Sequence, residues 1–111
     1  MNESQKKHEE LDDLTLLTIE VINIGADKKN LRILKLLPST IAKLMQEVKL
    51  SKSRVNTRVN DLQYCGLLER HLGTSEVILT YFGSFFISTT EKIKEKVEKH
   101  VIQHLRIKET H

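Results

Sequence analysis

Apolar residues recur at spacings of three and four near the start of the chain, which is the spacing of one face of an α-helix. This repeat predicts a helix over residues 9–25 that ends at Gly25. Its inward stripe consists of Leu11, Leu14, Leu17, Val21 and Ile24. Because Leu16 and Ile19 lie off this stripe, we expect the helix to be covered on two sides.

Three shorter helices follow, and small polar residues stand where each should begin. Asp, Ser and Thr side chains accept hydrogen bonds from the free backbone N–H groups of a helix start. The expected starts are marked by Asp27, by Ser39 or Thr40, and by Ser51. Pro38 should end the first of these helices, and Gly66 the last. The three helices are predicted over residues 28–37, 40–48 and 52–65.

The rest of the chain predicts two short strands and one long helix. The strands are expected over residues 67–72 and 77–80, and the glycine-containing segment 73–76 between them suits a hairpin turn. The helix is expected over residues 82–108. The fold class is therefore mostly α with a small β-hairpin, in a single domain over residues 1–111.

Composition supports one soluble domain. Of 111 residues, 39% are hydrophobic and 30% are charged, and four Gly and one Pro leave few breaks in helices. No apolar run approaches the ~20 residues of a membrane span. The first residues lack the apolar centre of a secretory signal, and Cys65 is the single cysteine. The expected location is cytoplasmic.

Charge is distributed unevenly along the chain. The net charge is −5 over residues 1–27, +7 over residues 28–72 and +1 over residues 73–111. A concentration of basic residues is typical of a face that binds phosphates. An ordinary solvated surface rich in lysine would give the same count, so charge alone leaves both interpretations open.

The segment STIAKLMQEVKLSKSRVNTRVNDLQYCGLLER resembles the winged helix-turn-helix of MarR-like and ArsR-like regulators, and the similarity covers about residues 30–80. The shared features are a short helix, a turn ending in Ser, a second helix with apolar residues at fixed spacing, and Gly-Leu-Leu entering a hairpin. The resemblance implies a winged helix-turn-helix over residues 28–80. It also implies a sequence-specific transcriptional regulator that binds double-stranded DNA, a dimeric repressor.

Helix 52–65 has the two faces that this role requires. Val55, Val59 and Leu62 share one face and should anchor the helix on its predecessor. In a helix-turn-helix the second helix enters the major groove, where Asn can bond adenine and Ser or Thr can serve most bases or phosphates. The candidate DNA-binding residues are Ser51, Lys52, Ser53, Arg54, Asn56, Thr57, Arg58, Asn60, Arg70 and His71.

The wing tip, Gly73-Thr74-Ser75-Glu76, contains no Lys or Arg. The wing is therefore expected to add only a phosphate contact, through Arg70 and His71. Two alternative functions stay open: a winged-helix adaptor that binds proteins, and a nucleoid-type protein that coats DNA with little sequence preference.

The predicted C-terminal helix 82–108 has a heptad pattern typical of a dimerisation helix. One row consists of Phe86, Ile93, His100 and Ile107, and a second of Thr90, Val97 and His104. Val101, Ile102 and Leu105 add apolar surface. The helix therefore predicts a homodimer, with the N-terminal helix as a further contributor. Packing of this helix on the N-terminal helix of the same chain is the alternative. Long paired terminal helices are similar to those of small archaeal winged-helix repressors, and the Lys- and Ile-rich composition without Trp fits an archaeal or archaeal-virus source.

Other chemistry is weakly represented. His100 and His104 share a helix face at the spacing of metal ligands, but no Cys or carboxylate pattern completes a site, so no metal and no cofactor is expected. Cys65 is either a redox switch at the end of helix 52–65 or a buried structural thiol. No catalytic constellation is visible, and the chain is not expected to be an enzyme.

Overall fold

A computed structural model describes residues 3–109 of the chain. Within these residues five helices form: α1 (Glu3–Ala26), α2 (Lys28–Leu36), α3 (Ile41–Val48), α4 (Lys52–Tyr64) and α5 (Tyr81–Glu109). Three short strands accompany them: β1 (Ser39–Thr40), β2 (Leu68–Arg70) and β3 (Glu76–Leu79). The predicted mostly helical fold with a small antiparallel sheet is confirmed.

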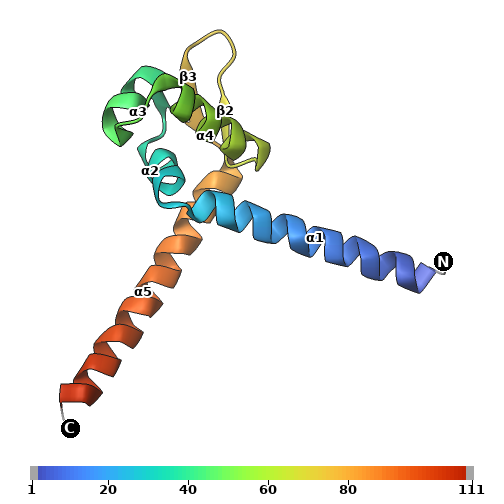
Figure 1. Cartoon of the computed structure of the whole chain (residues 1–111), viewed down its shortest axis with the longest axis vertical. Coiled ribbons are helices and arrows are strands. Elements are labelled where there is room, and N and C mark those ends of the chain that lie inside the picture. Colours follow the sequence, from blue (N-terminus) through green and yellow to red (C-terminus); the bar gives the residue numbers. More distant parts are fainter. Residues whose placement is uncertain (1–2, 110–111) are drawn as a thin grey trace.

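The chain forms a small folded head from which two long helices, here called the arms, extend (Figure 1). Residues 27–80 form the head, and α1 and α5 leave it in widely different directions. The radius of gyration is 18.5 Å, whereas a compact chain of this length would have about 13 Å. Most of both arms therefore lies outside the core of the chain.

The core lies between the helices and the sheet of the head. Its buried members are Ile33, Leu34, Leu44, Val48, Val55, Val59, Leu62, Leu67, Leu68 and Val77, together with Phe86 from α5. In α2, Ile33 and Leu34 are fully buried. Leu31 and Leu37, which follow the same helix spacing as Leu34, are only half-buried.

The predicted helix starts are confirmed. The side chain of Asp27 accepts from the backbone N–H groups of Lys29 and Asn30, and that of Thr40 accepts from Lys43. Ser51 caps α4 by accepting from the backbone N–H of Arg54. These contacts occupy amides that have no partner inside the helix.

The sheet has one strand more than the sequence predicted. Its order is β1-β3-β2, and both pairings are antiparallel. β1 consists of Ser39 and Thr40 alone, paired with Val77 and Glu76. Two residues are too few to show an alternating pattern, so only the tertiary pairing reveals this strand.

The N-terminal helix differs from its prediction at both ends. It begins at Glu3, six residues before the predicted start, and runs through Gly25 to Ala26. Gly25 serves close packing, since a Cβ there would lie 2.6 Å from Cζ of Phe86. The expected cover on two sides is also wrong within one chain, because Leu16 and Ile19 are exposed.

The second arm is fixed to the head where α5 begins. The hydroxyl of Thr80 donates to the carbonyl oxygen of Gly66 over 2.6 Å and accepts from the backbone N–H of Gly83 over 3.0 Å. Gly83 is buried, and a Cβ there would overlap the carbonyl of Leu67 and lie 2.7 Å from Cδ1 of Leu79. Only glycine therefore lets the helix approach the head so closely.

Gly83→Ala should lower the free energy of unfolding by about 1–3 kcal/mol, the usual cost of overpacking. Helix propensity alone would raise it by about 1 kcal/mol, so the sign of the change is diagnostic. Urea unfolding at fixed protein concentration measures it. Ser84→Ala, at the exposed neighbouring position, should stay within about 0.5 kcal/mol of the parent protein. A Gly83→Ala protein more stable than the parent would contradict the close contact.

Candidate nucleic-acid interface

Helix α4 presents a polar face to solvent from a well-anchored position. Val55, Val59 and Leu62 are fully buried beneath it. The side chains on the opposite side are exposed and form what we call the solvent face of α4: Ser53, Thr57, Asn60 and Tyr64. The predicted division of this helix into a buried and a polar face is confirmed.

The turn between α3 and α4 is tight. Lys49 adopts the left-handed conformation, with φ of 56° and ψ of 50°, and Ser51 then caps α4. Lys52 and Arg54 project from the first turn of α4 and are exposed. The first backbone N–H groups and the positive end of the helix dipole lie at the same end, which favours an anion there.

Arg70 of β2 orients two amides of α4. Its Nη2 donates to Oδ1 of Asn56 over 3.2 Å and to Oδ1 of Asn60 over 2.9 Å. Because a guanidinium has only donors, both amides must turn their oxygens toward it. Their NH₂ groups then face away from the wing. Arg70 was predicted as a phosphate contact, and in the free chain it holds these two side chains instead.

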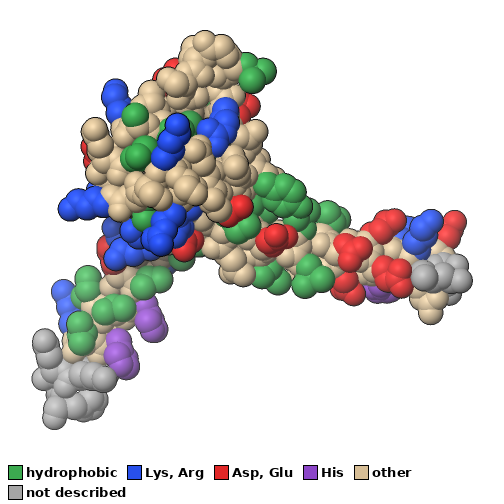
Figure 2. Space-filling model, turned by 45° about the horizontal axis from the view of Figure 1, so that its top comes forward, with side chains coloured by type: hydrophobic (Ala, Val, Ile, Leu, Met, Phe, Trp, Pro, Cys, Tyr) green, Lys and Arg blue, Asp and Glu red, His purple; other side chains and the backbone are tan. Residues whose placement is uncertain are grey.

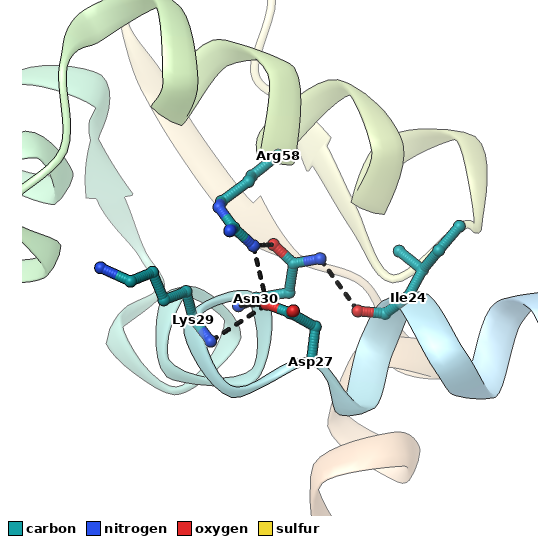
Figure 3. A network of polar contacts seen from close by, with 5 residues as sticks. All are labelled: Ile24, Asp27, Lys29, Asn30 and Arg58. Carbon is teal, nitrogen blue, oxygen red and sulfur yellow. Dashed lines mark hydrogen bonds and ion pairs between the residues drawn. The ribbon is translucent and has the colours of Figure 1, made fainter.

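Arg58 lies at the edge of the core side of α4. Its Nη1 contacts Oδ1 of Asp27 at 2.7 Å and Oδ1 of Asn30 at 2.9 Å (Figure 3). Asn30 is buried and donates from Nδ2 to the carbonyl oxygen of Ile24 over 2.9 Å. Although it was predicted to bind DNA, Arg58 thus joins α4 to the junction of α1 and α2.

Basic side chains are scattered over the head and gather near its junction with α5, whereas acidic ones follow the outer half of α1 (Figure 2). The polar surface of α4 continues onto α2. Lys29 of α2 lines an open cleft of about 490 Å³ together with Arg54 and Thr57 of α4. Sequence reasoning missed the exposed cations of α2 as site residues, although they contribute to the charge peak. They are Lys28, Lys29 and Arg32, together with Lys35, which pairs with Glu91 of α5.

The hairpin contributes little charge. His71 is exposed at the end of β2, and its Nδ1 lies 3.5 Å from the hydroxyl of Thr74. Gly73 adopts a φ of 86°, which suits the turn between the strands. Leu72, 93% exposed, stands at the tip instead of a cation.

The chain matches no protein-family model, no curated protein and no solved structure in comparisons with all three.

The predicted dimerisation residues divide into two groups. Phe86 is only 9% exposed and belongs to the core of the chain and not to an exposed seam, although it also lines an open cleft between α1 and α5. Its burial follows from the contact with Gly25. The others lie exposed along the outer part of α5: Ile93, Val97, His100, Val101, His104 and Leu105. The side chain of Ile107 is outside the described residues.

The two histidines stack on one another. The ring centroids of His100 and His104 are 6.4 Å apart, with 13° between the planes. Among the described residues, no group of three His, Cys, Asp or Glu side chains could hold a metal ion. Nor is any described helix long and apolar enough to cross a membrane.

Cys65 ends α4 in a half-buried position. Burial raises the pKa of its thiol, and the negative charges of Glu20 and Asp61 act in the same direction. Since the thiolate is the reactive form, this environment favours the structural interpretation of Cys65 over the redox one.

Asp27 is the titrating member of the contacts around Arg58. The backbone N–H of Asn30 and the positive charge of Arg58 lower the pKa of the Asp27 carboxyl below its ordinary value. The stabilisation is thus fully present above the unfolded-state pKa of about 4 and is lost as pH falls through the lower folded-state pKa.

Asp27→Asn should therefore lower the free energy of unfolding near neutral pH by about 0.5–1 kcal/mol, because Asn keeps the cap but loses the charge. The difference should shrink as pH falls below about 4 and continue to shrink through the lower folded-state pKa of Asp27. Chemical denaturation across this range measures it. Asp12→Asn, which removes an exposed carboxylate of α1, serves as the control and should show no such difference. Equal stability of Asp27→Asn and the parent protein at pH 7 would contradict the role of the ion pair.

Proposed function

We propose that this chain is a winged helix-turn-helix transcriptional regulator that binds double-stranded DNA in the cytoplasm. The order α2-β1-α3-α4-β2-β3 supports it, with α3 and α4 as the helix-turn-helix and the β2–β3 hairpin as the wing. In this arrangement α4 is the recognition helix and lies in the major groove.

The observation that carries the proposal is the polar solvent face of α4 flanked by unpaired cations. Short hydroxyl and amide side chains on an exposed face contribute little to folding, but they match base edges in the major groove. Lys52 and Arg54 on α4, with Lys29 on α2, are exposed and form no ion pair within the described residues. In the proposed complex they bind phosphates beside the helix.

A regulator of this kind acts as a dimer that presents two recognition helices. Two half-sites one helical turn apart, about 34 Å, would be bound together. Exposed apolar residues on the outer part of α5 support such pairing. We therefore propose repression by occlusion of promoter DNA.

A protein-binding adaptor is the second candidate. Tyr64 is 75% exposed at the end of the solvent face, and Leu72 is 93% exposed at the wing tip. Asp61, also exposed, lines the same cleft as Arg54. Exposed aromatic and apolar side chains beside mixed charges suit a protein partner.

Salt separates these two candidates. If a dimer neutralises about 6–10 phosphates, log K should fall with log salt at a slope of roughly −5 to −9. Fluorescence anisotropy with a labelled duplex selected from a random pool measures the slope. A flat response would contradict the DNA proposal and favour the adaptor.

Substitutions should separate residues that read bases from residues that bind phosphates. Thr57→Ala and Asn56→Ala should each relax sequence preference by about 1–3 kcal/mol where the parent side chain bonds well to a base. Lys52→Ala and Arg54→Ala should weaken selected and random duplexes about equally, because phosphates carry no sequence. Lys7→Ala, on the outer end of α1, is the charge-matched control and should leave DNA binding unchanged. If Thr57→Ala and Asn56→Ala both leave the DNA sequence preference unchanged, the proposal that α4 lies in the major groove is wrong.

A further inference from the structure

An open apolar cleft lies where the two arms leave the head. Its volume is about 590 Å³, and the arms supply its walls. Leu14, Leu17 and Ile22 line it from α1, while Phe82, Phe85 and Ile93 line it from α5. All six of these side chains are also exposed to solvent.

The exposed apolar surface continues far beyond this cleft. Of the 16 large hydrophobic side chains exposed in the described residues, 14 belong to α1 or α5. Leu11 extends the row toward the outer end of α1, and Val97, Val101 and Leu105 extend it along α5. Single chains rarely expose continuous apolar surface on this scale. A small ligand could fill the cleft, but it would leave both rows uncovered, so the occupant must be elongated.

The charges of the arms identify that occupant. α1 carries six acidic and two basic side chains, a net charge of −4. α5 carries four acidic and six basic side chains, a net charge of +2. At 1.5 Å per residue, the 24 residues of α1 and the 29 of α5 form rods of about 36 and 43 Å. Each arm therefore matches the other in length, in apolar surface and in sign of charge.

We propose that the cleft is filled by a second copy of this chain, with α1 of each copy lying along α5 of the other. Two-fold symmetry makes the two contacts identical. Pairing α1 with α1 would instead bring two acidic arms together, and pairing α5 with α5 two basic arms. Cross-pairing also covers α1, which a seam between two α5 helices would leave bare. The inference deepens the dimer of the proposed function and does not depend on DNA binding.

Exchange of charge between the arms tests the pairing. The first variant carries Glu10→Lys and Asp13→Lys on α1, and the second carries Lys96→Glu and Lys99→Glu on α5. All four residues are exposed and in no ion pair within the described residues. The first variant changes the net charge of α1 from −4 to 0, which removes its attraction to α5, and the second changes α5 from +2 to −2, so that it repels acidic α1. In an equal mixture of the two, mixed dimers regain one parent contact, between α1 at −4 and α5 at +2.

Sedimentation equilibrium without DNA provides the readout. Each variant alone should dimerise at least tenfold more weakly than the parent protein, and the mixture should dimerise more tightly than either variant alone. Salt at 1 M shortens the screening length to about 3 Å and should restore much of the self-association of the second variant, whose arms repel each other.

Three outcomes would overturn the inference: dimers of both variants as tight as the parent dimer, no recovery in the mixture, or a parent protein that stays monomeric at about 100 μM. Loss of DNA binding with the pairing intact would count against the proposed function alone.

Discussion

The amide of Asn30 is the buried polar group on which the relative placement of three helices depends. Its NH₂ group binds the carbonyl oxygen of Ile24 in the last turn of α1, and its oxygen accepts from Arg58 of α4. Asp27 alone separates α1 from α2, and it binds the same guanidinium. A buried amide that loses a partner costs about 1–3 kcal/mol. The direction of α1 and the position of α4 are therefore linked through the side chain of Asn30.

Local features of the fold could be predicted because their causes lie within a few residues. Asp27, Thr40 and Ser51 each cap a helix by bonding amides two or three residues ahead. The buried face of α4 followed from the spacing of Val55 and Val59. These contacts need no knowledge of distant parts of the chain.

The remaining features depend on partners far apart in sequence. Arg58 lies 31 residues from Asp27, so its position on the helix alone suggested a solvent role. Phe86 fitted a heptad row, but the missing Cβ of Gly25 gives its ring a place in the core. Arg70 could be recognised as a neighbour of Asn56 and Asn60 only once the hairpin was folded against α4. The candidate site was thus predicted in its helix and its turn, but not in the pairing of its arginines.

The way α5 leaves the head also decides what lies next to the wing. Gly83 puts helix backbone directly against the carbonyl of Leu67 and close to the side chain of Leu79, and Thr80 ties the same turn to Gly66. Lys35 and Glu91, in contact at 2.6 Å, brace the helix two turns further out. The base of α5 is therefore joined to the head at two places, the start of β2 and the helix α2. Leu67 lies three residues before Arg70, so the position of α5 and the side chain that orients Asn56 and Asn60 belong to one short stretch of backbone.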